Sequence, residues 1–505
     1  MHYRNPVISG FHPDPSVCRS GEDYYLVTSS FEYSPGVPLF HSKDLVHWEP
    51  IGHCLTRPEQ LDLSKAWTSG GIYAPTIRFH EGMFYMTTTN VSGGGNFIVY
   101  TDNPRGVWSD PIFVDQPGID PDLFFGDDGA VYYSTSWDRD GQGAYQSRID
   151  LRTGQRLSDI KLIWKGTGGQ FPEAPHLYRI GQWYYLLIAE GGTEYGHMAT
   201  VARSTQPDGP FESCPHNPIL THRSLQRPIQ ATGHGDFVQT PDGRWWAVFL
   251  GIRPAGYPMR HHLGRETFLA PVTWTADGWP IIGEGGTVAD AMPADGLALR
   301  PLPAPAVRDH FEAARLSPAW TFLRTPNPPH WTLAEQTSCL TLHGTPSTLN
   351  DGGTPAFVGR RQQHFACRAS ALMAFDPQHD GEEAGLTVFM NERFHYEIAV
   401  TRIRGERKVV FRRRIGSLWK VENEAPWSEA SIVLTVRADR EQYAFGFASG
   451  DDREPFWFGR GECAMLAAEM AGGFTGVIIA MYATGSGSAA RTPAHFDWFD
   501  YEALD

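Results

Sequence analysis

The sequence contains no run of about 18 consecutive apolar residues, and its first residues, Met1 to Pro6, lead into a segment with proline and glycine instead of an apolar leader. This excludes a membrane-spanning helix and predicts a cytoplasmic protein. The six cysteines are scattered, without the short paired spacings of a zinc site or of a dense disulfide framework. We therefore expect free thiols in a reducing compartment.

Positive charge is also scarce. The chain has 42 Lys and Arg against 57 Asp and Glu, which gives a formal net charge of -15 at pH 7. Such a protein repels the phosphate backbone of nucleic acids, whereas a neutral sugar polymer is not repelled. The sequence thus disfavours nucleic acid and favours small neutral oligosaccharides as partners. It does not determine the oligomeric state, and a homo-oligomer is possible.

Aromatic residues (13%), glycine (53) and proline (38) are abundant, a composition typical of many short strands joined by tight turns. At 505 residues the chain exceeds the length of about 250–300 residues at which a single hydrophobic core stops growing. We expect an all-β protein of two domains.

Five segments share one pattern, in which a turn is followed by two adjacent aromatic residues and a short apolar run. The aromatic pairs are Tyr24-Tyr25, Phe84-Tyr85, Tyr132-Tyr133, Tyr184-Tyr185 and Trp245-Trp246. The second aromatics follow one another at spacings of 60, 48, 52 and 61 residues, which fits four-stranded propeller blades of about 40–50 residues with loop insertions. The repeat predicts a five-bladed β-propeller, with a pair of stacked β-sandwiches as the alternative.

The repeat stops near residue 285, and the proline-rich stretch Pro301 to Ala306 follows, which is typical of a stiff connector between domains. Beyond it, alternating apolar runs such as Gly385 to Met390 and Phe394 to Val400 predict a second all-β unit, a β-sandwich. We assign residues 1–295 to the propeller, residues 296–308 to a proline-rich linker and residues 309–505 to the sandwich.

The first strand of each propeller blade lines the central channel, so equivalent positions of successive blades meet in one small volume. In each repeat, one candidate residue stands ten to twelve positions before the first aromatic of the pair. In chain order these residues are Asp14, Tyr73, Asp120, Glu173 and His234. Each is ordinary alone, because acids beside proline are common in turns and a histidine is often a hydrogen-bonding structural residue. Their equivalent placement predicts a site on the axis, although Asp122 competes with Asp120 on the same strand face.

Carboxylates gathered in one channel perturb each other's pKa values, so that one stays protonated while another is ionised. Glycoside hydrolysis needs this arrangement. A protonated carboxyl donates to the leaving oxygen, and an ionised carboxylate activates water or attacks the anomeric carbon. A third acid near the donor can keep the pKa of the donor high. Phe31, Trp67 and Tyr73 are candidate apolar faces for a sugar ring.

Five segments closely resemble glycoside hydrolase family 43 and stand in the order of that family: Phe11 to Ser16, Tyr73 to His80, Ile119 to Phe125, Pro172 to His176 and Leu263 to Thr267. Within the family, the chain is similar to the β-xylosidase and α-L-arabinofuranosidase branch. The resemblance implies a propeller followed by a β-sandwich, a concanavalin-like jelly roll, and it extends to the closing segment Ala494 to Tyr501.

The resemblance implies that Asp14 is the general base, Glu173 the general acid and Asp120 the acid that tunes and orients the donor, in a reaction that inverts the anomeric configuration. It also implies a set of substrate contacts, the last of them from the C-terminal domain at the pocket rim: Phe31, Tyr73, His234, Arg265 and Phe474. This mechanism requires no cofactor. In some members a histidine at the position of His234 contacts a cation, commonly calcium, so a calcium ion near His234 is the one metal that the resemblance suggests.

We expect an exo-acting hydrolase that releases terminal β-D-xylose from xylo-oligosaccharides and also accepts α-L-arabinofuranose. An enzyme that mainly removes arabinofuranose is the close alternative, because small differences in pocket shape decide between the two sugars. An alternative of another class is a non-catalytic sugar-binding propeller. The three acids argue against it, because neutral sugars do not require three carboxylates held together at a desolvation cost.

Overall fold

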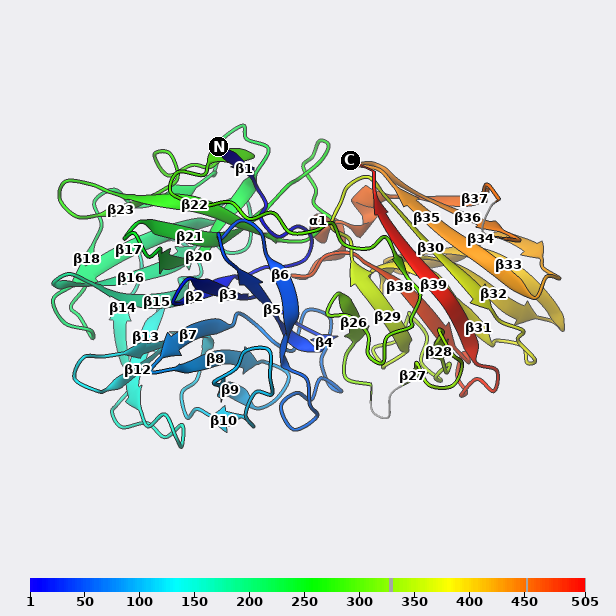
Figure 1. Cartoon of the computed structure of the whole chain (residues 1–505), viewed down its shortest axis with the longest axis horizontal. Helices are drawn as coiled ribbons and strands as arrows, with labels where there is room; N and C mark the ends of the chain where they lie inside the picture. The colour runs from blue at the N-terminus through cyan, green and yellow to red at the C-terminus, as the bar shows by residue number, and fades with distance from the viewer. Residues whose placement is uncertain (327–329, 451–452, 505) are drawn as a thin grey trace.

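The computed structural model describes residues 1–326, 330–450 and 453–504. Two units lie side by side along the long axis of the molecule, and both chain ends lie near the top of the view in Figure 1. The first unit, on the left of that view, is built from five small sheets and one two-stranded sheet, and the second, on the right, is built from two large sheets. The predicted fold, an all-β five-bladed propeller followed by a β-sandwich, is confirmed.

The five blades are each made of strands that follow one another in the sequence. They comprise β2 (Ser16–Ser20), β3 (Asp23–Val27), β5 (Gly36–Ser42) and β6 (Glu49–Leu55); β7 (Thr76–His80), β8 (Met83–Asn90), β9 (Gly95–Thr101) and β10 (Ile112–Phe113); β11 (Ile119–Phe125), β12 (Val131–Asp138), β13 (Gln142–Ile149) and β14 (Lys161–Trp164); β15 (Glu173–Ile180), β16 (Trp183–Glu190), β17 (Met198–Ser204) and β18 (Glu212–Ser213), with β19 (Leu220–Thr221) also on β17; and β20 (Gln230–Gln239), β21 (Trp245–Ile252), β22 (Glu266–Trp274) and β23 (Pro280–Ile282).

The predicted aromatic pairs all fall on the second strand of a blade, namely β3, β8, β12, β16 and β21. Their rings join neighbouring blades. Tyr25 of the first blade packs edge-on against Phe84 of the second at 4.7 Å between ring centroids, and Tyr184 of the fourth packs against Phe124 of the third at 5.9 Å. Such pairs contribute beyond their buried area, so the repeat marks the positions that hold the blades together.

The segment before the first blade closes the propeller. Strand β1 (His2–Arg4) pairs with β24 (Ala291–Pro293), and Ile8 is bridged to Thr267 of the fifth blade. After β24 the chain has no strand until β25 (Arg308–Asp309), which pairs with a strand of the sandwich. The predicted linker 296–308 therefore lies between β24 and β25, with Arg308 already part of β25.

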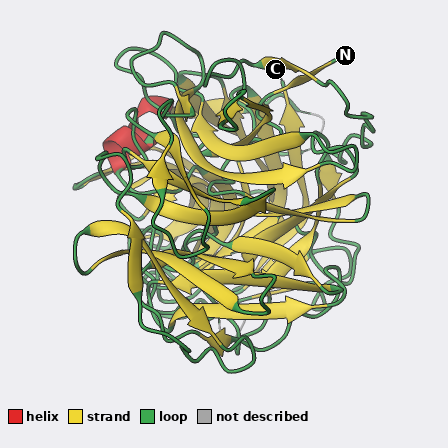
Figure 2. Ribbon diagram, turned by 90° about the vertical axis from the view of Figure 1, so that its left-hand side faces the viewer, coloured by secondary structure: helices red, strands yellow, loops and turns green. Residues whose placement is uncertain are grey.

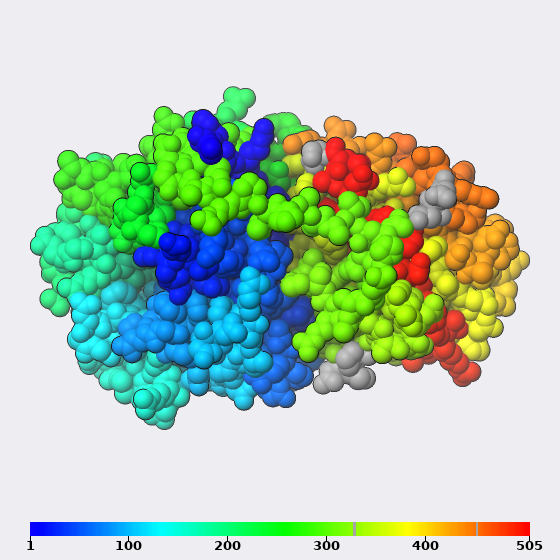
Figure 3. All heavy atoms as spheres, viewed as in Figure 1, coloured from blue at the N-terminus to red at the C-terminus, as the bar shows by residue number. Residues whose placement is uncertain are grey.

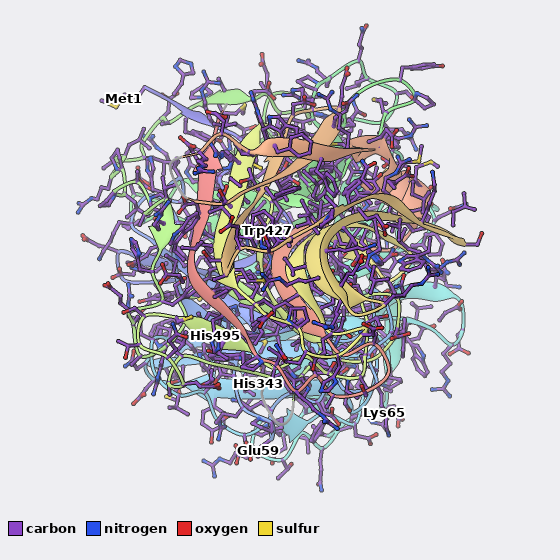
Figure 4. The ribbon with its side chains drawn as sticks, turned by 90° about the vertical axis from the view of Figure 1, so that its right-hand side faces the viewer. Met1, Glu59, Lys65, His343, Trp427 and His495 are labelled. Carbon is purple, nitrogen blue, oxygen red and sulfur yellow. The ribbon has the colours of Figure 1, made fainter. Side chains whose placement is uncertain are left out.

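Two eight-stranded sheets form the sandwich. The first contains β25, β27 (Trp331–Thr332), β28 (Leu340–Leu342), β30 (Cys367–Ala374), β35 (Ser431–Ala438), β36 (Gln442–Ala448), β37 (Phe456–Glu462) and β39 (Ala494–Ala503), and the second contains β4 (Tyr33–Ser34), β26 (Trp320–Leu323), β29 (Ala356–Arg361), β31 (Glu383–Asn391), β32 (Phe394–Ile403), β33 (Glu406–Ile415), β34 (Leu418–Pro426) and β38 (Ile478–Thr484). Figure 4 looks onto this end of the molecule, with Trp427 near the centre and His343 and His495 near each other below it.

One strand of the sandwich comes from the propeller. Strand β4 lies between β3 and β5 of the first blade in sequence, yet Ser34 pairs with Phe322 of β26. A sheet of the second unit therefore continues into the first unit, directly beside Phe31. This exchange fixes the sandwich against the mouth of the propeller.

Helix is almost absent from the described residues. Figure 2 shows in red the only helices of this part, the 3-10 helix η1 (Cys463–Leu466) and the helix α1 (Ala468–Ala471). Neither approaches the length of about 20 residues that a membrane crossing needs. All six cysteines are buried, and none forms a disulfide in the described part of the chain.

Candidate active site

A cavity of about 310 Å³ opens where the propeller axis meets the sandwich. All eight residues that we expected to act on the substrate or to contact it line this cavity: Asp14, Phe31, Tyr73, Asp120, Glu173, His234, Arg265 and Phe474. Trp67, considered as a further face for a sugar ring, is 55% exposed and lies outside the lining. The repeat therefore located the residues of one cavity, supplied by all five blades and by the sandwich.

Backbone irregularities turn these side chains toward the axis. Asp14, Asp120 and His234 have φ angles of 56°, 52° and 47°, in the left-handed region that residues other than glycine seldom adopt. Strand pairing shifts register around Asp120 in β11, around His234 in β20 and just after Glu173 in β15. A β-bulge re-aims a side chain and stores local strain, a combination that clusters at functional sites.

Asp14 is held in its ionised form. Arg265 Nη1 lies 2.6 Å from Asp14 Oδ1, and the hydroxyl of Ser29 donates to Oδ2 at 2.6 Å. Burial by itself would raise the pKa of Asp14, but Arg265, followed by His234 and Ser29, lowers the pKa below its ordinary value. Asp14 is therefore a carboxylate throughout the neutral pH range.

Glu173 and Asp120 are pushed in the opposite direction. Burial and then the charge of Asp14 raise the pKa of Glu173 to about 7, while Arg265 opposes the rise. Burial and the charges of Glu173 and Asp14 raise the pKa of Asp120 well above its ordinary value. Two buried acids that repel each other titrate as a pair, so the pair retains a proton near neutral pH. The cavity thus combines an ionised carboxylate with a protonated one.

An aromatic wall stands beside the acids. The ring centroids of Phe31 and Tyr73 lie 5.3 Å apart, and Phe474 lies 5.9 Å from Phe31 and 6.2 Å from Tyr73. Phe474 comes from the sandwich, just before β38, and its backbone N–H donates to Ser69 Oγ of the propeller at 2.8 Å. The guanidinium of Arg265 lies over both phenylalanine rings, at 5.6 Å and 5.7 Å. The second unit therefore completes the wall of the cavity.

A second polar layer lies a few residues further along the inner strands, with one residue from each blade: Ser16, Arg78, Asp122, His176 and Asp236. The guanidinium of Arg78 lies 2.7 Å from a carboxylate oxygen of Asp122 and 2.7 Å from one of Asp236. The two carboxylates raise the pKa of Arg78 against the effect of burial. Asp122, the competitor of Asp120, is thus engaged by Arg78 and lies outside the cavity lining.

The side chains near His234 do not form a calcium site by themselves. Calcium takes six to eight oxygen ligands, whereas the carboxylate beside His234, Asp14 Oδ1 at 3.6 Å from Nδ1, is already paired with Arg265. Further along the axis, the guanidinium of Arg78 is paired with both Asp122 and Asp236. Within the described ranges there is no cluster of three or more His, Cys, Asp or Glu that could hold a metal ion.

Six lining residues were not predicted from the sequence: Ala74, Ile119, Phe171, Gly192, Thr193 and Glu194. The first three lie within two positions of a predicted residue in the sequence, so a wider window around each repeat position would have found them. Gly192 to Glu194 belong to the loop after β16, which no repeat pattern marks. Tyr195 ties this loop to the sandwich, because its hydroxyl donates to Glu469 Oε1 at 2.8 Å.

Comparison with models of protein families gives two matches that together span most of the chain. The model described as Glycosyl hydrolases family 43 matches residues 3–280. The model described as the β-xylosidase C-terminal concanavalin A-like domain matches residues 308–502. The first match contains the propeller acids and the second contains Phe474.

Individual proteins resemble the chain over its whole length. A non-reducing end α-L-arabinofuranosidase of Bacteroides ovatus is 43% identical over 513 residues, which cover 100% of this chain and 95% of that protein. A xylosidase/arabinosidase of Butyrivibrio fibrisolvens is 38% identical over 99% of both chains. Among solved structures, the Bacteroides ovatus xyloglucan PUL GH43B superimposes with a TM-score of 0.95 and 42% identity over 100% of both chains.

Proposed function

This chain belongs to glycosyl hydrolases family 43 and is a glycoside hydrolase, and we propose that it is an exo-acting, inverting enzyme that removes one terminal pentose from short neutral oligosaccharides. The observation that carries this proposal is the cavity of about 310 Å³, in which an ionised and a protonated carboxyl face one space that Phe474 closes on the sandwich side. A cavity closed at its rim favours a terminal sugar over cleavage within a chain. A non-catalytic sugar-binding propeller is not retained.

In the proposed mechanism Asp14 is the general base. Its lowered pKa keeps it ionised, so it can take a proton from a water molecule that attacks the anomeric carbon. Glu173 is the general acid, because a pKa of about 7 lets it hold a proton for the leaving oxygen at neutral pH. Asp120 is the third acid, and burial and the charge of Glu173 raise its pKa well above the ordinary value. We assign to it the orientation of Glu173.

The sugar-binding roles follow from position. The aromatic wall of Phe31, Tyr73 and Phe474 offers apolar faces to a pentose ring. His234, whose pKa burial lowers to about 4, is neutral and can exchange hydrogen bonds with sugar hydroxyls. Arg265 lies between Asp14 and the aromatic wall, where its guanidinium can donate to a hydroxyl of the bound sugar.

We propose that the released pentose is α-L-arabinofuranose or β-D-xylose, with both accepted. The xylosidase/arabinosidase relative supports dual activity. The sequence motifs alone favour xylose. The relative at 43% identity is an α-L-arabinofuranosidase, which strengthens the case for arabinofuranose as the released sugar. We also propose that catalysis requires no cofactor, because the acids and Arg265 provide the proton transfers and the charge balance.

The test is proton NMR of the first product formed from xylobiose and from an arabinofuranosyl-substituted xylo-oligosaccharide. We expect one pentose to appear with the anomeric configuration opposite to that of the substrate. Retention of configuration would overturn the assignment of Asp14 as base, and oligosaccharide products without free pentose would overturn exo action. Initial rates on chromogenic arabinofuranoside and xyloside then rank the two sugars.

A further inference from the structure

A second cavity, of about 530 Å³, lies at the seam between the first blade, the linker and the sandwich. Its wall contains Phe40 and Trp48 of the first blade, Pro303 and Pro305 of the linker, and Arg360 and Arg361 of β29. Figure 3 shows the green linker crossing the molecule between the blue first blade and the sandwich. In the described chain, the linings of this junction cavity and of the active-site cavity have no residue in common.

Arg361 is buried in the wall of the junction cavity without a counter-charge. Arg361 is only 6% exposed, and its Nε and Nη2 atoms have no hydrogen-bond partner. No carboxylate of the described residues lies within the ion-pairing distance of 4.0 Å. Arg265 and Arg324, which are buried to a similar degree, are both paired with a carboxylate, at 2.6 Å and 2.5 Å.

Burial lowers the pKa of Arg361 to about 10, and the phenol of Tyr33 opposes that effect. An unpaired buried cation is costly, because the protein interior replaces the water that would otherwise solvate the charge. The cation–π contact with Phe11, whose ring centroid lies 5.4 Å from the guanidinium carbon, offsets only part of this loss, because a neutral ring supplies no counter-charge. The wall therefore presents a positive charge that lacks a partner.

The neighbours of Arg361 increase the positive potential. Arg360 lines the same cavity, and its guanidinium lies over the rings of Trp320 and Tyr501 without a carboxylate of the described residues within 4.0 Å. Glu49 is the one acidic residue among the described residues of the lining, and Arg105 Nη2 lies 2.6 Å from its Oε2. Two arginines thus line one cavity that has no free acid in its described lining, in a protein whose net charge is -15.

We propose that the junction cavity is an anion-binding site, in which Arg361, with Arg360 beside it, holds a small oxyanion, a carboxylate or a phosphate. A guanidinium forms strong, charge-assisted hydrogen bonds to the oxygens of such a group. The apolar walls of Phe40 and Trp48 leave room for a small organic body behind a carboxylate. Because the wall is built from both units and the linker, an occupant stabilises the seam that holds the sandwich over the active site.

The test measures the melting temperature of the whole protein at constant ionic strength, with sodium chloride replaced stepwise by acetate, D-glucuronate or inorganic phosphate. We expect at least one oxyanion to raise the melting temperature by about 1–3 °C and to saturate, because a ligand that binds only the folded state stabilises it. A larger response to acetate and glucuronate than to phosphate identifies a carboxylate site, and the reverse identifies a phosphate site.

Arg361→Gln should abolish this response, whereas Arg460→Gln, on an exposed arginine of β37, should retain it. In chloride alone, Arg361→Gln should melt no lower than the parent protein, because it removes an uncompensated buried charge. If Arg361→Gln does not fold, calorimetric titration of the parent protein with the same three anions decides the question. The proposal is overturned if no oxyanion stabilises or binds to the parent protein, or if Arg361→Gln responds as the parent does.

Discussion

Nη1 of Arg265 lies 2.6 Å from Oδ1 of Asp14, although the two residues stand 251 positions apart in the chain. This contact separates the charge states of the acids in the cavity. It lowers the pKa of Asp14, which remains ionised, while burial and the charge of Asp14 raise the pKa of Glu173 to about 7. One ion pair thus creates the difference between base and acid that hydrolysis needs.

Asp14→Asn and Glu173→Gln should each lower turnover at least about a hundredfold, the usual scale of general acid–base catalysis. Asparagine tolerates the left-handed backbone of position 14, so the fold should persist. Glu173→Gln should recover partly on a substrate whose leaving group needs no proton, whereas Asp14→Asn should not. Asp102→Asn, on an exposed acid, is the matched control. Near-normal turnover by both variants would refute the assignment.

The pH profile of kcat/KM should be bell-shaped, because it reports the free enzyme's acid and base. Activity should fall as the pH rises through about 7, where Glu173 loses its proton, and it should fall on the acid side only below the ordinary range of an aspartate, where Asp14 is protonated. Asp120→Asn should leave the alkaline limb near pH 7, because burial and the charge of Asp14 are what raise the pKa of Glu173. A downward shift of the limb would show that the charge of Asp120 also raises that pKa.

Arg78→Met should lower the free energy of unfolding by about 3–5 kcal/mol, because it leaves Asp122 and Asp236 buried without their partner. Combining it with Asp122→Asn and Asp236→Asn should recover part of the loss, since the unpaired charges are then gone. Denaturant unfolding of both variants measures this difference. Equal stability of the single and triple variants would mean that the ion pairs do not account for the loss.

Removal of divalent cations should leave activity and melting temperature unchanged. Arg78 is paired with both Asp122 and Asp236, and Arg265 is paired with Asp14, the carboxylate beside His234, so each of these acids already has a cationic partner. The measurement compares kcat and the melting temperature after dialysis against a chelator and after calcium is added back. A loss on chelation that calcium restores would instead place a functional cation near His234.

Phe474→Ala should lower kcat/KM by about two- to tenfold, mainly through KM, because an aromatic contact contributes about 0.5–1.5 kcal/mol. The ring lies 5.9 Å from Phe31 in the wall of the cavity. Phe456→Ala, on an exposed phenylalanine of β37, is the control and should leave kinetics unchanged. If Phe474→Ala keeps the parent KM on every substrate, the sandwich does not contribute to sugar binding.

Much of the site could be predicted because a propeller converts a sequence period into a spatial one. Once the aromatic pairs are aligned, Asp120 and Glu173 occupy equivalent positions whatever the detailed packing. Alternation along a strand could not separate Asp120 from Asp122, since both lie on one face of a regular strand. The bulge at Asp120 breaks that alternation, and Arg78 takes Asp122.

Other features had no local signal. The pairing of β4 with β26 joins residues almost 300 positions apart, and the loop at Thr193 and Glu194 enters the cavity without any repeat motif. Their placement depends on how the sandwich packs against the propeller. No periodicity within either unit encodes that packing.

The sequence by itself determined the all-β class, the number of blades and the acids that meet on the axis, because these follow from short-range patterns repeated at a regular spacing. Only the tertiary structure decided which acid is ionised, which aspartate faces the cavity and how Phe474 completes its wall. The physical reason is that a carboxyl's charge state depends on burial and on neighbours such as Arg265, which folding brings close from distant parts of the chain.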